Sequence, residues 1–103
     1  MPSVHFVERK NNVHPIPESL GEWESGYWLI AEETAQRLIG ADLYLHSGQS
    51  DPSHFGGKIV AFRIHRDDSE IDGRIVFRIK VSPEYKGVKT EHKGWGNEKK
   101  IVW

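Results

Sequence analysis

Residues 26–64, GYWLIAEETAQRLIGADLYLHSGQSDPSHFGGKIVAFRI, decide the fold that the sequence predicts. The stretch opens with a short apolar, β-prone segment, residues 27–30, which carries Tyr27 and Trp28. Residues 32–39 then place Ala35, Leu38 and Ile39 on one face of a two-turn helix. Gly40 suits the left-handed position that often ends a helix. A helix this short is stable only when it packs on a sheet.

The rest of the stretch predicts two strands joined by a long polar loop. Residues 42–46 alternate, with Leu43 and Leu45 facing inward and Tyr44 and His46 on the other face. Residues 47–57 form the loop, and residues 58–65 form the second strand. A wide aromatic surface next to a polar loop suits the binding of a flat polar ring, such as a nucleobase.

Further short strands surround this stretch. Residues 4–7 alternate like an edge strand, and two prolines in residues 11–20 indicate an extended connector. Residues 18–24 fit either one helical turn or a loop. Residues 74–81 are the most regular strand, with Ile75, Phe77, Ile79 and Val81 inside. A turn at residues 66–73 precedes it, a polar segment at residues 84–100 follows it, and residues 101–103 form a last strand.

Length and composition predict one domain, residues 1–103, of class α+β. The elements suggest a small, mixed, partly closed β-barrel of five to six strands with one or two short helices. The 103 residues include no cysteine, so disulfides and thiolate metal sites are excluded. Neither a membrane span nor a signal-peptide pattern is present, which predicts a cytoplasmic protein without a membrane partner.

The net charge of −1 hides an asymmetry between the two halves of the chain. Residues 1–57 carry three Lys or Arg and eight Asp or Glu, whereas residues 58–103 carry eleven and seven. A basic second half permits contacts to phosphate. The sequence pI of about 6.6 is low for a non-specific nucleic-acid binder, so a pocket or local charge must supply the affinity.

The order of these elements resembles PUA-like folds, the group that includes the EVE, ASCH and YTH domains. In YTH readers of methylated adenine, a tryptophan ends an early strand and a helix follows. A strand then leads through a serine-containing loop to an aromatic–glycine pair. The matching pieces here are Trp28, residues 32–39, residues 42–47 and residues 55–57. The resemblance implies a pocket for a modified base in RNA, in modified DNA or in a free nucleotide.

Candidate base-binding residues follow from this expectation. Trp28 would form one wall of the pocket, with Trp95, Tyr27 or Trp23 as a second, although Trp28 also fits a place in the core. Hydrogen-bonding side chains of the loop would read the edge of the ring. These are Ser47 first, then His46 and Asp51, and finally Gln49; the alternative is a solvated loop with local turns.

Basic side chains of the second half are candidates for contacts to phosphate. Arg74, Arg78 and Lys80 share one face of a strand, and an ordinary solvated face is the alternative interpretation. The full set is Arg63, Arg74, Arg78, Lys80, Lys86 and Lys89.

Other chemistries receive little support from the sequence, which predicts no metal, cofactor or catalytic residue. His46 and His54 lack partners at metal-ligand spacing. Ser47 and His46 are neighbours on a strand and point to opposite faces, which argues against a hydrolytic triad with Asp51. The main alternative is an ASCH-type hydrolase or nuclease that uses Glu32, Glu33 or Lys58. A protein–protein module is the third hypothesis.

Overall fold

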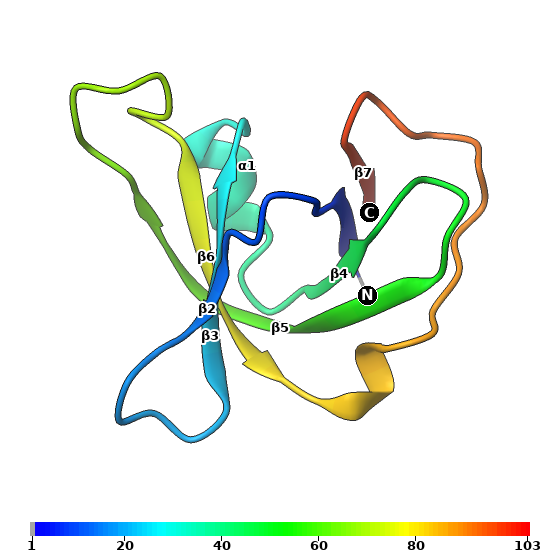
Figure 1. Ribbon diagram of the computed structural model, residues 1–103. Helices are drawn as coiled ribbons and strands as arrows, with labels where there is room; N and C mark the ends of the chain where they lie inside the picture. Colours follow the sequence, from blue (N-terminus) through cyan, green and yellow to red (C-terminus); the bar gives the residue numbers. More distant parts are fainter. Residues whose placement is uncertain (1) are drawn as a thin grey trace.

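The computed structural model describes residues 2–103, which form a single mixed β-sheet with little helix. Within these residues the sheet has seven strands in the order β2-β3-β6-β5-β4-β1-β7 (Figure 1). The elements are β1 (Ser3–Val7), β2 (Val13–Pro15), β3 (Glu22–Trp28), α1 (Glu32–Arg37), β4 (Asp42–His46), β5 (Ser53–Ile64), β6 (Ile75–Val81), the 3-10 turn η1 (Pro83–Tyr85) and β7 (Lys99–Val102). The class α+β is therefore confirmed.

The strand β1 is not the edge strand that its sequence predicted. It pairs in parallel with β4 and antiparallel with β7, so that Val4 lies opposite both Leu43 and Ile101. Its two neighbours come from distant parts of the chain, which a local pattern does not reveal. The edges of the sheet are instead β2, which contains Pro15, and β7. A partly closed barrel is not confirmed, because β2 and β7 are not paired to each other.

The long strand β5 bends through the sheet and joins its two halves (Figure 1). It takes over residues 53–57 of the loop that was predicted at residues 47–57, so the loop ends at residue 52. Gly56 and Gly57 lie where β5 passes close to β4 and β6, and a Cβ atom there would collide with Leu43 O and Lys80 O. One extra residue at His54 and one at Val60 form bulges that add to the bend.

The core fills the inner face of this bent sheet. Val4, Phe6, Leu43, Leu45, Ile59, Ile75, Phe77 and Ile79 are nearly inaccessible to solvent, as are Ala35 and Leu38 of the helical segment. The inward positions predicted for residues 43, 45, 75, 77 and 79 are confirmed. Ile39 is 41% exposed, because the helix ends at Arg37 and the chain turns at Gly40, which has φ +89°. Among the described residues, no helix has the length and apolar character needed to cross a membrane.

Candidate functional site

A cleft lies between two parts of the sheet that are not hydrogen-bonded to each other. Its larger part has a volume of about 510 Å³ and is lined by Phe6, Tyr27, Trp28, Leu29, Arg74 and residues 96–99. A second part of about 290 Å³ adds residues 7–10, Asn12 and Ile71. Both parts share Tyr27, Trp28, Arg74 and Glu98, so they adjoin. The larger volume falls within the usual range for small-molecule sites.

A bulge in β3 places Trp28 on the cleft wall. Ser25 lies opposite Phe77 and Trp28 opposite Ile75, so β3 contains one extra residue between these pairs. The bulge brings Ser25 and Trp28 to one side, where the Trp28 indole donates a 3.0 Å hydrogen bond to Ser25 Oγ. The same indole stacks on Phe6 at 3.9 Å between ring centroids and is only 7% exposed. Trp28 is thus both a core residue and part of the wall.

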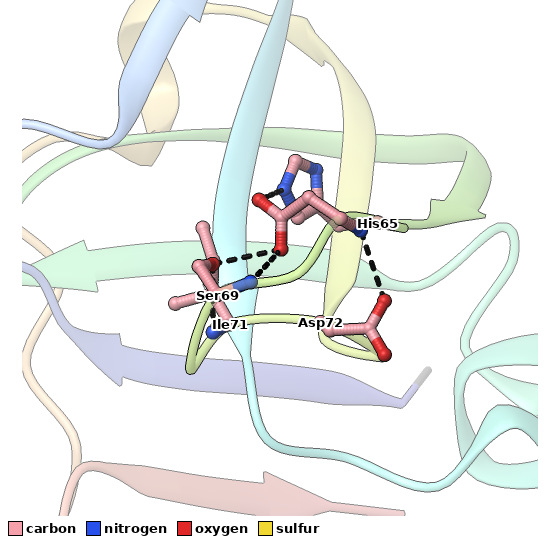
Figure 2. Close-up of polar contacts among 5 residues, drawn as sticks. His65, Ser69, Ile71 and Asp72 are labelled. Atoms are coloured by element: carbon pink, nitrogen blue, oxygen red, sulfur yellow. Dashed lines mark hydrogen bonds and ion pairs between the residues drawn. The ribbon is translucent and has the colours of Figure 1, made fainter.

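Tyr27 is the more accessible aromatic side chain of the cleft. It is half-buried, and its ring packs on His65 at 4.7 Å between centroids. His65 lies beside the turn between β5 and β6, whose polar contacts are drawn in Figure 2. There Asp67 contacts His65 Nε2 at 2.6 Å and accepts a 2.7 Å hydrogen bond from the Ser69 hydroxyl. Hydrogen bonds from Ser69, and then the contact with His65, lower the pKa of Asp67 to about 2.

The same turn brings two further residues to the cleft. Ile71 O accepts a hydrogen bond from the backbone N–H of Arg74, and both residues line the second part. Within residues 2–103, no carboxylate lies at ion-pairing distance from the Arg74 guanidinium. The turn therefore positions Tyr27, Ile71 and an unpaired cation on one rim.

The charge of the cleft is positive. Arg9, Lys10, Arg74 and Lys99 line it, against the acidic side chains of Glu8 and Glu98. The Glu8 carboxylate accepts hydrogen bonds from the backbone of Lys10 and Asn12, and Lys99 Nζ donates to Leu29 O at 2.8 Å. The cleft thus combines an aromatic wall with several cations, an arrangement suited to an anionic ligand that carries a flat ring.

The opposite face of β1 carries a closed polar cluster formed by His5, His46, Tyr44 and Trp95. Phe6 faces the cleft and the core, so its neighbour His5 points to the other side. His5 stacks on Tyr44 at 4.8 Å, and Trp95 packs edge-on against His46 at 5.6 Å. Trp95 therefore lies across the strand from Trp28, and the two do not form opposite walls of one pocket.

A chain of hydrogen bonds connects the histidines of this cluster. His5 Nδ1 lies 2.9 Å from His46 Nε2, and His46 Nδ1 lies 2.8 Å from Asp51 O. The carbonyl requires His46 Nδ1 to be the donor, which leaves its Nε2 to accept from His5. Burial, followed by the charges of His46 and Lys100, lowers the pKa of His5 to about 4, and burial lowers the pKa of His46. Both rings are therefore neutral at pH 7.

The remaining predicted base-binding residues do not line the cleft. Trp23 packs against Phe55 at 4.9 Å. Ser47 and Asp51 are exposed, and their backbone carbonyls accept hydrogen bonds from Arg9 and His46. Gln49 donates to the carbonyls of Gly96 and Asn97, at 3.3 and 2.8 Å, and so holds the segment that forms one wall.

Of the predicted phosphate-binding residues, only Arg74 lines the cleft. Arg63 forms hydrogen bonds of 3.0 Å with both carboxylate oxygens of Glu24, and Arg78 donates to Glu22 at 2.6 Å. Acidic residues of β3 thus neutralise much of the predicted basic stripe. Lys80, Lys86 and Lys89 are exposed and lie outside the cleft.

Candidates for other chemistry are also separate from the cleft. Glu32 and Glu33 are exposed on α1, and Lys58 pairs with Asp42 at 3.2 Å. Within residues 2–103, no three His, Asp or Glu side chains are grouped so that they could hold a metal ion.

Several lining residues were missed by sequence reasoning. Residues 96–99 reach the cleft because Val7 N–H donates to Glu98 O at 2.9 Å, which is a long-range contact without a local signal. Arg9 and Lys10 directly follow a strand, and only their charge could have indicated a role in ligand binding. Comparison of the chain with known family models, curated proteins and solved structures gave no match.

Proposed function

We propose that this protein binds a nucleotide in the cleft, either free or as part of RNA or modified DNA. The base, modified or not, stacks against Tyr27 and the accessible edge of Trp28. Arg74, with Arg9 and Lys10 in the adjoining part, contacts phosphate. The protein acts as a binding module and carries out no reaction.

The observation that carries this proposal is Arg74 at the aromatic wall, which has no carboxylate partner among residues 2–103. Two other arginines of the sheet, Arg63 and Arg78, pair with acidic side chains. Arg74 instead lines both parts of the cleft beside Tyr27 and Trp28. An aromatic face with an adjacent guanidinium provides the two contacts that nucleotides offer, which are stacking and charge-assisted hydrogen bonds.

The resemblance of residues 26–64 to PUA-like domains gives separate support. We propose a PUA-like relationship, in which the wall formed by Trp28 after an early strand and before a helix serves a base. On this view the seven-stranded sheet is an open version of the partly closed barrel.

Calorimetric titration with nucleoside monophosphates and short single-stranded oligonucleotides, unmodified and methylated, tests the proposal. Tyr27→Ala is expected to weaken binding roughly tenfold through loss of stacking. Arg74→Ala is expected to weaken it about tenfold through loss of a charged hydrogen bond. Tighter binding of an oligonucleotide than of the matching monophosphate would identify nucleic acid as the ligand.

Arg78→Ala is the matched control, because Arg78 belongs to the same strand region but pairs with Glu22 outside the cleft. It should leave affinity unchanged. If no nucleotide binds the wild-type protein, or if Arg74→Ala and Arg78→Ala weaken binding equally, the proposed site is wrong.

A further inference from the structure

Glu98 is an acidic side chain in a cleft that otherwise favours anions. It lines both parts of the cleft, together with Tyr27, Trp28 and Arg74. Its backbone carbonyl is held by the N–H of Val7 at 2.9 Å, so its position is tied to the end of β1. Within residues 2–103, no Lys, Arg or His nitrogen lies within ion-pairing distance of its carboxylate.

A free carboxylate opposes phosphate binding, so it must face another part of the ligand. An ionised carboxylate only accepts hydrogen bonds, and its two oxygens accept best from two donors side by side. A ligand that binds here is therefore expected to present adjacent N–H groups near Glu98, while its phosphate lies in the second part of the cleft, beside Arg9 and Lys10.

The four common bases differ in their ability to do this. Guanine carries two adjacent donors on its Watson–Crick edge, N1–H and the N2 amino group. Adenine and cytosine each place one amino group beside a ring nitrogen that accepts, and that nitrogen would repel the second carboxylate oxygen. Uracil flanks its single N–H with two carbonyl oxygens. Of the four common bases, only guanine therefore offers two adjacent donors to the oxygens of Glu98.

We infer that the cleft selects guanine nucleotides, with the Glu98 carboxylate accepting from N1–H and the N2 amino group. This inference rests on the proposed function, because it assigns the base that the same cleft binds. Glu98 is the residue that determines specificity, whereas Tyr27 and Arg74 supply affinity that does not depend on the base.

Titration with guanosine, inosine and adenosine monophosphates tests the inference directly. Inosine keeps N1–H but lacks the N2 amino group, so it removes one of the two hydrogen bonds. The wild-type protein is expected to bind guanosine monophosphate about tenfold more tightly than inosine monophosphate, since hydrogen bonds to charged groups are strong. Adenosine monophosphate should bind at least as weakly as inosine monophosphate.

In Glu98→Gln, the difference between the guanosine and inosine nucleotides should shrink to about twofold or less, because the amide offers one acceptor in place of two. Glu91→Gln is the matched control. Glu91 is an exposed acid of the same segment that does not line the cleft, and its replacement changes the net charge equally. It should retain the full preference for guanine.

The outcomes separate the inference from the proposed function. Equal binding of all three nucleotides, or an unchanged preference in Glu98→Gln, overturns the inference and leaves nucleotide binding intact. Absence of binding by any nucleotide overturns the proposed function and the inference together. A guanine preference that is lost in Glu98→Gln and kept in Glu91→Gln supports both.

Discussion

The regions on the two sides of β1 both contain aromatic and ionisable side chains, but these side chains have different surroundings. The inner face borders an open cleft, where Arg74 has no acidic partner among residues 2–103 and Tyr27 is partly accessible. The outer face carries His5 and His46, which are buried, hydrogen-bonded to each other and covered by Trp95. Aromatic and ionisable side chains together therefore do not identify a site. Unused hydrogen-bonding capacity beside open space is the better indicator.

This difference also explains why the predicted base-binding residues are separated. The polar loop that follows β4 is anchored by its own backbone, and Gln49 holds residues 96 and 97. The hydrogen bonds of this loop therefore stabilise the fold. In the cleft, Arg74 and Glu98 have no ion-pair partner among residues 2–103 and can bind a ligand.

The largest loss of stability is expected at Trp28, which belongs to both the cleft wall and the core. Trp28→Ala should destabilise the protein by about 3–5 kcal/mol, because it removes the stack on Phe6 and leaves a cavity. Tyr27→Ala, which affects a half-buried ring of the same wall, should cost about 1 kcal/mol. Denaturant unfolding of both variants measures this. Equal losses would mean that Tyr27 is also structural.

Low pH should destabilise the folded protein through His5 of the closed polar cluster. Since the pKa of His5 is about 4 when folded and 6.5 when unfolded, the unfolded chain binds more protons between these values. Stability therefore falls as the pH drops from about 6.5 to 4, by up to about 3 kcal/mol, and the loss is complete below that range. The charged or ionisable groups that face His5 are His46, Tyr44 and Lys100.

Unfolding measured at pH 7 and pH 4.5 tests this expectation. His5→Leu should reduce the dependence on pH, whereas replacement of the exposed His92 with Gln should retain it. An unchanged dependence in His5→Leu would show that another group is responsible.

A smaller change is expected at Trp95. Its indole N–H is buried without a hydrogen-bond partner among the described residues. Trp95→Phe keeps an aromatic ring against His46 and removes this unpaired donor, so stability should change by less than about 1 kcal/mol. A loss of about 2 kcal/mol or more in thermal unfolding would indicate that the indole forms a contact through water.

The smallest loss of stability is expected at Arg78, which forms an exposed ion pair with Glu22. Arg78→Ala breaks an exposed pair with Glu22 and should cost about 0.5 kcal/mol, with the loss fading at high salt. Denaturation at low and high salt measures it. A loss that does not depend on salt would point to packing by the arginine stem.

The sequence predicted what depends on local pattern. The bounds of β4, the inward positions of β6 and the left-handed Gly40 are confirmed. Prediction from the sequence failed where segments that are far apart in the chain meet in the fold. The pairing of β1 with β7, the extension of β5 through Gly56 and Gly57, and the approach of Glu98 to Val7 depend on contacts between residues far apart in the chain.

The candidate site follows the same rule. Trp28 was predicted as a pocket wall from a local feature, an aromatic residue before a helix, and it lines the cleft, whereas its stack on Phe6 had no local sign. The local pattern of the predicted basic stripe did not reveal that Glu24 contacts Arg63 and that Glu22 contacts Arg78. Pairing across a sheet decides which charges are free.

The position of β1 also has a consequence for folding during synthesis. Val4 and Phe6 are synthesised before both partners of β1, since β4 follows at residues 42–46 and β7 only at residues 99–102. One edge of β1 therefore stays unpaired until residues 99–102 have emerged. Non-local pairing of this kind folds slowly, and the unpaired strand is a route to aggregation.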